Sequence, residues 1–186
     1  MISVRPAHPA YAPSIGAVHV AAWRSAYAGI LPDTYLARLS VARQAAHYDA
    51  AIRSGAGVHV AMATGEDLDG RGGTMRIVGF TTSGLARGRY GLAEGEIETL
   101  YVLDDWRDRG IGRQLMAAAA EYLAGRGCNS AFLWVLRDNP SRWFYQRLGG
   151  KPAAEQLIRV GGQDVIQTAY VWSPIDRLVD ATSAAP

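Results

Sequence analysis

The chain has 186 residues, of which 49% are hydrophobic and 19% charged; this composition is typical of one folded domain and excludes a disordered chain. The net charge of +2 is too small for a dedicated nucleic-acid binder or a polybasic membrane-surface protein. The single cysteine, Cys128, cannot form an internal disulfide, and there is no Cys/His cluster for a metal, no long apolar span and no signal-peptide pattern, so we expect a soluble, cytoplasmic protein without a metal.

The N-terminal half alternates between extended and helical patterns. After a short first strand, apolar residues recur at helical spacing, and Ser40 is a typical N-cap for the third helix. Three further segments predict an antiparallel meander, with a Gly- and Asp-rich hairpin loop at 64–74. In chain order, the predicted elements are strand 3–5, helices 12–26, 32–39 and 41–52, and strands 57–63, 75–85 and 94–103.

The C-terminal half contains the one strand–helix–strand unit that requires a parallel pair of strands. Its predicted elements are helix 110–124, strand 131–136, helix 140–148, a hairpin of strands 156–160 and 165–172, and a frayed tail from residue 180. The order β-α-α-β-β-β-α-β-α-β-β predicts an α/β fold with a mixed, mostly antiparallel sheet of about seven strands and helices on both faces. We expect a single domain over 1–175 and a C-terminal tail at 176–186.

A glycine-containing turn stands between the third meander strand and the long helix. Gly110 and Gly112 lie at the helix start, where glycine lets the backbone approach a ligand closely. The first N–H groups of a helix lack internal partners, and with the helix dipole they form an anion site that suits a pyrophosphate. Arg107, Arg109 and Arg113 can add charge-assisted contacts. The alternative is a helix start whose glycines serve packing alone.

Two segments resemble motifs of the Gcn5-related N-acetyltransferases (GNAT). Residues 107–112 (RDRGIG) match the pattern [Q/R]-x-x-G-x-[G/A] after an LYV strand. Residues 138–150 resemble the N…FYxxLGF segment of the same family, with Gly150 where Phe is commonest. The N-terminal segment 18–32 is similar to that of many bacterial members, and the order of predicted elements agrees with the GNAT fold from about residue 2 to 173.

The resemblance implies acetyl transfer from acetyl-CoA to an amine. In this family the strand before the glycine motif splays from the next parallel strand, and the pantetheine arm binds in the gap like an added strand. Here the gap would lie between residues 100–103 and 131–136. The residues implied in cofactor binding are Leu100, Tyr101, Val102, Arg107, Arg109, Gly110, Ile111, Gly112, Arg113, Asn139 and Tyr145.

Glu96 and Glu98 are the candidates for the catalytic base. They lie on the strand that leads to the glycine turn, and at period 2 they share one face unless a bulge intervenes. An ammonium substrate must lose a proton before it attacks, and a carboxylate can accept that proton directly or through water. The alternative is that one or both belong to a solvated strand face.

Tyr145 falls on the family's tyrosine, which often protonates the sulfur of CoA as it leaves. A phenol near its usual pKa can donate to a thiolate within hydrogen-bond distance. The alternative is a core aromatic whose hydroxyl has a backbone partner. Asn139 is expected to contact the pantetheine, and a plain N-cap is the competing interpretation.

The acceptor site is implied at the loop between the first helices and at the last hairpin. Trp23, Tyr27 and Asp33, with Tyr35, surround that loop, and aromatic rings with a carboxylate would suit a cationic amine. Ordinary packing of a helix pair explains the same residues equally well. Cys128 and the histidines are expected to be structural.

Two other functions compete with N-acetyl transfer. A non-catalytic acyl-CoA-binding or regulatory module would keep the cleft, although Glu96, Glu98 and Tyr145 count against it. A nucleotide- or phosphate-binding domain would use the same turn, but the P-loop motif and a doubly wound pattern are absent. The acceptor stays open among polyamines, aminoglycosides, amino acids, peptide N-termini and lysines, as do the acyl length and the oligomeric state, although dimers are common in the family. Nucleic acid and membrane are not expected as partners.

Overall fold

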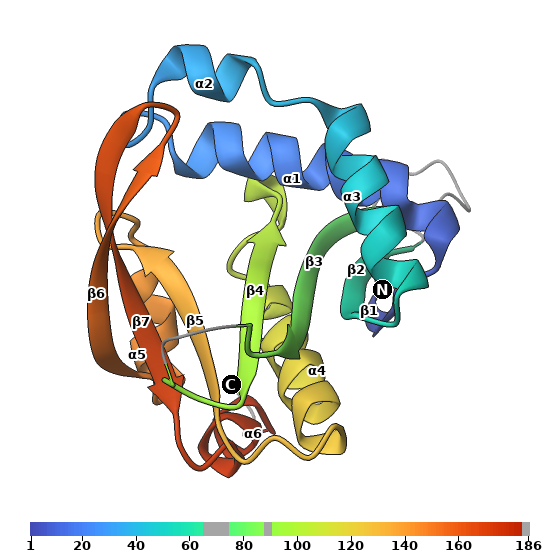
Figure 1. The fold of residues 1–186 in the computed structure, drawn as a ribbon. Coiled ribbons are helices and arrows are strands. Elements are labelled where there is room, and N and C mark those ends of the chain that lie inside the picture. The colour runs from blue at the N-terminus through green and yellow to red at the C-terminus, as the bar shows by residue number, and fades with distance from the viewer. Residues whose placement is uncertain (65–74, 88–90, 184–186) are drawn as a thin grey trace.

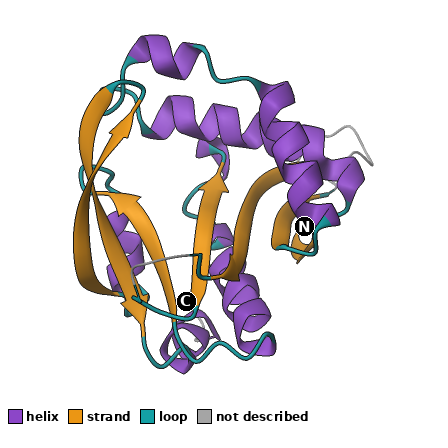
Figure 2. Ribbon diagram, in the orientation of Figure 1, coloured by secondary structure: helices purple, strands orange, loops and turns teal. Residues whose placement is uncertain are grey.

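The computed structural model describes residues 1–64, 75–87 and 91–183, and it contains one sheet covered by helices on both faces (Figures 1 and 2). The strands are β1 (Ile2–Pro6), β2 (Gly57–Ala63), β3 (Arg76–Leu85), β4 (Gly95–Val102), β5 (Ala131–Leu136), β6 (Lys151–Val160) and β7 (Gln163–Trp172). The helices are α1 (Ala12–Ala26), α2 (Asp33–Ala37), α3 (Val41–Arg53), α4 (Ile111–Gly125), α5 (Arg142–Arg147) and α6 (Asp176–Ser183), with short 3₁₀ turns η1 (Pro9–Tyr11) and η3 (Asp104–Trp106).

The sheet has seven strands in the order β1-β2-β3-β4-β5-β7-β6. Neighbouring strands are antiparallel except β4 and β5, which are parallel and are joined through α4. The predicted mixed, mostly antiparallel α/β fold is therefore confirmed. No helix among the described residues is long and apolar enough to cross a bilayer.

The parallel pair separates soon after it forms. Only Gly95 with Ala131 and Glu96 with Phe132 pair, and beyond them β4 and β5 diverge (Figure 1). The predicted gap between these strands is present. Its position matters because a strand edge without a ladder partner offers N–H and C=O groups to a ligand.

The alternating pattern of the N-terminal strands divides the core between the two faces of the sheet. On β2, Val58, Val60 and Met62 pack against α1 and α3 on one face. Ala61 and Ala63 point to the other face, toward the start of α4. The period of two thus produces the two apolar faces that the helices cover.

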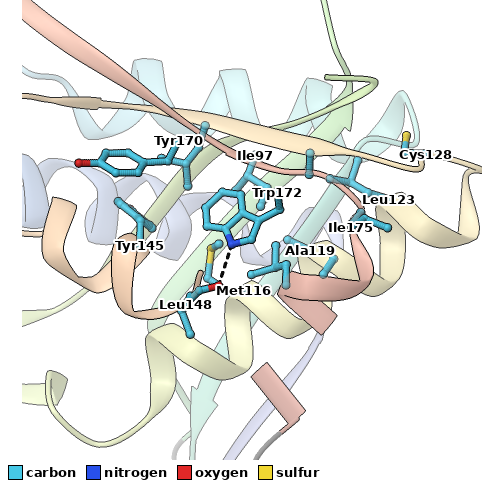
Figure 3. Close-up of a cluster of buried hydrophobic side chains, with 14 of the residues drawn as sticks. Ile97, Met116, Ala119, Leu123, Cys128, Tyr145, Leu148, Tyr170, Trp172 and Ile175 are labelled. Carbon is cyan, nitrogen blue, oxygen red and sulfur yellow. Dashed lines mark hydrogen bonds between the residues drawn. The ribbon is translucent and has the colours of Figure 1, made fainter. Parts of the chain in front are cut away.

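Around the C-terminal strands, a second core surrounds Trp172 (Figure 3). The fully buried indole of Trp172 packs between β5, α4 and α5, and its Nε1 donates a hydrogen bond of 2.8 Å to the carbonyl of Leu148. Because the one polar group of the indole is hydrogen-bonded, its burial leaves no unsatisfied donor in the core. This core holds α5 against β7.

Gly150 is the position where the family resemblance leads one to expect Phe. A Cβ at Gly150 would lie 2.7 Å from Cζ2 of Trp172 and 2.9 Å from the carbonyl oxygen of Tyr145. Both distances are shorter than a real Cβ contact, and one partner is backbone, which cannot move away cheaply. Trp172 therefore occupies the volume that a larger residue 150 would need.

We expect Gly150→Ala to lower the free energy of unfolding by roughly 1–3 kcal/mol through overpacking. Urea denaturation followed by tryptophan fluorescence measures this loss. Gly125→Ala is the matched control, because a Cβ there meets nothing within 4 Å and alanine favours the end of α4. A Gly150→Ala protein as stable as the parent would show that the Trp172 core adjusts freely.

The end of the chain differs from the expected frayed tail. Residues 176–183 form helix α6, in which Leu178 is fully buried against the Trp172 core. The guanidinium of Arg113 donates hydrogen bonds to the carbonyls of Ala181 and Thr182 at the end of this helix. The expectation of a frayed tail from residue 180 is therefore wrong for residues 180–183, where the helix continues and Ala181 packs on the Trp172 core.

The start of β6 also differs from the boundary expected from the sequence. β6 begins at Lys151 rather than at residue 156, because pairing with β7 extends it through a register shift between Pro152 and Ala154. In the predicted hairpin loop at 64–74, residues 65–74 lie outside the described part of the chain.

Candidate active site

A cavity of about 910 Å³ opens where β4 and β5 separate. It is bounded by β4, β5, the start of α4, α5, α1 and the β6–β7 hairpin. The predicted site residues that line it are Trp23, Tyr27, Glu96, Glu98, Leu100, Tyr101, Val102, Arg107, Gly110, Ile111, Gly112, Arg113, Asn139 and Tyr145. Arg109 and Asp33 are not among the lining residues, and Asp33 is exposed at the start of α2.

The glycine turn takes the backbone through two left-handed positions before α4. Asp108 has φ of 58° and Gly110 has φ of 75°. Glycine adopts this left-handed conformation without steric cost. The N–H of Gln114 bonds to the carbonyl of Gly110 at 3.1 Å, so the amides of residues 111–113 precede the first turn of helical bonds. Their dipoles and that of α4 make this end of the cavity suited to an anion.

The three arginines expected at the phosphates all have partners within the protein. Arg107 forms an ion pair with Asp104 at 2.8 Å, and the Arg109 guanidinium lies 4.7 Å from the ring centroid of Trp106. Arg113 is bonded to the end of α6. The backbone amides at the start of α4 therefore remain the groups of the turn best suited to hold an anion.

We expect Gly112→Asp to weaken CoA binding by about tenfold or more, because it places a negative charge at the second residue of α4. A Cβ at Gly112 is 3.4 Å from Phe144, an ordinary contact, and aspartate suits the first turn of a helix, so the variant should fold. Calorimetry with CoA measures the change, and Gly112→Ala is the uncharged control. Equal affinity in Gly112→Asp and the parent would place the pyrophosphate elsewhere.

A β-bulge on β4 falls at Glu98, one of the two candidate bases. Ile97 pairs with Ser83 and Thr99 with Thr82, which leaves Glu98 as the extra residue. The carboxylate of Glu98 forms an ion pair with Arg87 and accepts a hydrogen bond from its guanidinium, with 2.7 Å between Nη2 and Oε1. The bulge interrupts the simple alternation, yet both glutamates line the cavity.

Burial raises the pKa of Glu96, and the nearby charge of Glu98 raises it further. Arg87 opposes both effects through a backbone hydrogen bond and its positive charge. A carboxylate whose pKa is moved toward neutrality is a better general base than an ordinary glutamate. Glu96 therefore has the electrostatic character that proton abstraction needs.

The hydroxyl-bearing ring of Tyr145 is buried at the wall of the cavity on α5. Burial raises the pKa of Tyr145, and the neighbouring Tyr27 contributes in the same direction. The phenol thus keeps its proton throughout the neutral range. Its O–H group can therefore donate a hydrogen bond at neutral pH.

Asn139 and Tyr27 lie beside Tyr145 in the same cavity. The Oδ1 of Asn139 accepts a hydrogen bond of 2.9 Å from the N–H of Ser141, in the turn that precedes α5. The N-cap of α5 is Ser141, which makes no side-chain capping bond, so Asn139 is not a plain N-cap. Burial raises the pKa of Tyr27, and the side chains of Tyr101 and Asn139 partly offset that rise. The ring of Tyr27 meets Trp23 edge-on, with centroids 4.8 Å apart.

The histidine of α1 has a packing role. His19 Nδ1 is 2.7 Å from the hydroxyl of Tyr48, and its ring stacks on Trp23 with centroids 5.2 Å apart. Burial, with a smaller contribution from His47, lowers the pKa of His19 to about 4, so the ring is neutral near pH 7. Cys128 is buried and is not among the residues that line the cavity.

Several lining residues were not anticipated from the sequence. They include Thr99, Ser141, Arg147, Ile158, Val160 and Gln167. The alternation along β6, with Ile158 and Val160 on one face, was a usable signal for two of them. The others depend on which strand edges and which side of α5 face the gap, and this is a tertiary property.

Comparison with known proteins agrees with this geometry. Residues 21–150 match the acetyltransferase (GNAT) family. The chain is 32% identical over 178 residues, or 96% of each protein, to the uncharacterised N-acetyltransferase YuaI of Bacillus subtilis (strain 168). YncA from Salmonella typhimurium, solved with its cofactor acetyl-CoA, has a TM-score of 0.66 at 20% identity over 92% of this chain and 93% of its own.

PaiA N-acetyltransferase from Thermoplasma acidophilum, solved in complex with coenzyme A, has a TM-score of 0.63 at 18% identity over 90% of this chain and 98% of its own. These two structures show a shared fold. The family match spans most of the chain and includes the glycine turn and α5. The chain therefore belongs to the acetyltransferase (GNAT) family, and it is an N-acetyltransferase.

Proposed function

We propose that this protein transfers an acetyl group from acetyl-CoA to a primary amine by direct attack within a ternary complex. The observation that carries the proposal is a single cavity whose lining includes an anion-binding helix start, a phenol with a retained proton and a carboxylate of raised pKa. These are the groups that amine acetylation requires.

The residues of the gap fit acetyl-CoA. The ladder between β4 and β5 ends at Glu96, so the β5-facing edge of β4 from Thr99 to Val102 is available to the amides of a pantetheine arm. The amides before Gln114 would hold the pyrophosphate. When bound, acetyl-CoA supplies an activated thioester, and the protein supplies position and proton transfer. CoA or acetyl-CoA is bound in two structures of the same fold, which supports this assignment.

Glu96, with Glu98 beside it, would accept the proton that the ammonium must lose before its nitrogen can attack. As the N–C bond forms and the C–S bond breaks, Tyr145 would donate its proton to the sulfur. The second proton released by the nitrogen would restore the phenol, directly or through water. The products are the amide and the free thiol, and one proton leaves to solvent through the carboxylate.

The test is thiol release from acetyl-CoA over a panel of amines, with mass detection of the product. We expect release that depends on amine, one acetylated product for each thiol, and intersecting rather than parallel double-reciprocal plots. Acetyl-CoA binding without amine-dependent release would instead identify an acyl-CoA-binding module. Parallel plots would indicate an acyl-enzyme and overturn direct attack.

A further inference from the structure

One part of the cavity is built from apolar side chains of distant segments, and we call it the acceptor basin. Its residues are Trp23, Tyr27, Leu31, Leu136, Ile158 and Val160. They come from α1 and the loop that follows it, from β5, and from β6. All six belong to one apolar cluster, so the basin is continuous.

The β6–β7 hairpin presents an apolar face to the basin and a different face to solvent. Ile158 and Val160 pack on the cluster, whereas Leu157, the residue before Ile158, is 65% exposed. A ligand that reaches the basin therefore meets aliphatic and aromatic surface, which favours an apolar carbon skeleton.

The charged residues among the described lining of the cavity fall into two groups. Arg107 and Asp108, of opposite charge, come from the glycine turn, Arg113 comes from the start of α4, and Arg147 comes from the end of α5. Glu96 and Glu98 come from β4, and Arg87 already neutralises one negative charge through Glu98. The remaining charge near the bases suits one ammonium, not several.

The charged residues that line the cavity also disfavour an acceptor that carries a carboxylate. Among the described residues near Glu96, the cation is Arg87, and it is engaged by Glu98 at 2.7 Å. A substrate carboxylate would lie near two glutamates without a dedicated partner, and this costs binding energy.

Contacts between the hairpin and the loop after α1 close one side of the basin (Figure 1). Nε2 of Gln163 donates a hydrogen bond of 3.2 Å to the carbonyl of Ile30. Gly161 packs so closely on Tyr35 that a Cβ there would lie 2.5 Å from the ring. This contact narrows the access of a folded protein surface to the basin and favours a small molecule.

We propose that the acceptor is a small primary monoamine with an apolar skeleton, an alkyl- or arylalkylamine without a carboxylate or a second ammonium group. This inference rests on the proposed function, because it assigns the substrate class of that same cavity. Apolar packing supplies the binding energy, and the single net negative charge beside it positions the nitrogen.

Two matched pairs of amines test the class by thiol release. Hexylamine and 1,6-diaminohexane differ in a second ammonium, and 2-phenylethylamine and phenylalanine differ in a carboxylate. We expect kcat/KM at least about tenfold higher for the first member of each pair, and no acetylation of surface lysines on folded hen lysozyme. A diamine, amino acid or folded protein used as well as the monoamines would overturn the proposal and leave acetyl transfer intact.

A pair of variants on β6 tests the basin itself. Ile158→Asp adds a carboxylate to the basin, and Leu157→Asp adds the same charge to the exposed face of the strand. We expect Ile158→Asp to raise KM for hexylamine by about tenfold or more and to raise it less for 1,6-diaminohexane, while Leu157→Asp changes neither. Ile158→Ala, which should raise KM for both amines, replaces Ile158→Asp if that variant does not fold. Equal KM values in the position-158 and position-157 variants would overturn the basin as the acceptor site.

Calorimetry separates failure of this inference from failure of the proposed function. Hexylamine is titrated into the protein with CoA present, in the parent and in Ile158→Ala. Binding that weakens in the variant, with no thiol release from acetyl-CoA, would uphold the substrate class and refute catalysis. Thiol release that is fastest with 1,6-diaminohexane would uphold catalysis and refute the substrate class.

Discussion

Tyr145→Phe is expected to lower kcat by roughly 10- to 10³-fold and to leave acetyl-CoA affinity nearly unchanged. Burial raises the pKa of Tyr145, so the phenol stays protonated at neutral pH, and its O–H group can donate a hydrogen bond to the sulfur as negative charge develops there. This interaction is stronger in the transition state than in the ground state, and its loss therefore falls on kcat. Steady-state kinetics and calorimetry with CoA on one preparation measure both quantities.

Tyr170→Phe is the matched control for this experiment. Tyr170 is buried with its ring 6.3 Å from that of Tyr145, but it does not line the cavity. Its hydroxyl accepts a hydrogen bond of 3.2 Å from Gln146, so its loss should cost about 0.5–1.5 kcal/mol of stability with normal turnover. If Tyr145→Phe behaves like Tyr170→Phe, with a lower melting temperature and preserved kcat, Tyr145 is a core residue and not a proton donor.

The second large effect is expected in the double variant Glu96→Gln/Glu98→Gln, with a loss of roughly 10²-fold or more in kcat/KM near neutral pH. Glutamine keeps the shape of the side chain and removes its basicity. Burial and the charge of Glu98 raise the pKa of Glu96, so the parent should gain activity as pH rises through that raised value. The variant should lack this acidic limb and recover in part at high pH, where the amine loses its own proton.

The single variants assign the role, and an exposed glutamate provides the control. Glu96→Gln should carry most of the loss, because Glu98 is engaged by Arg87. Glu121→Gln, on the exposed side of α4, should leave both kcat/KM and the pH profile unchanged. Full activity of the double variant at pH 7 would eliminate both carboxylates as the base.

Much of the fold could be predicted because its signals are local. The apolar run at 131–136 indicated a buried strand, and the glycines after β4 indicated a helix start that can hold an anion. The requirement for a connecting helix then restricted the parallel pair to β4 and β5. Spacing of apolar residues and turn chemistry depend on neighbours in the chain, so they can be read without a structure.

The candidate site could be predicted only in part, because its residues acquire their properties from contacts across the chain. The sequence by itself determined the order of the elements, the glycine turn and the presence of Glu96 on the strand before it. Only the tertiary structure decided that Arg113 binds the end of α6 and that Ile158 of β6 lies in the same cavity as Glu96. Packing of distant segments sets burial and charge separation, and these determine pKa and binding, so no local pattern contains them.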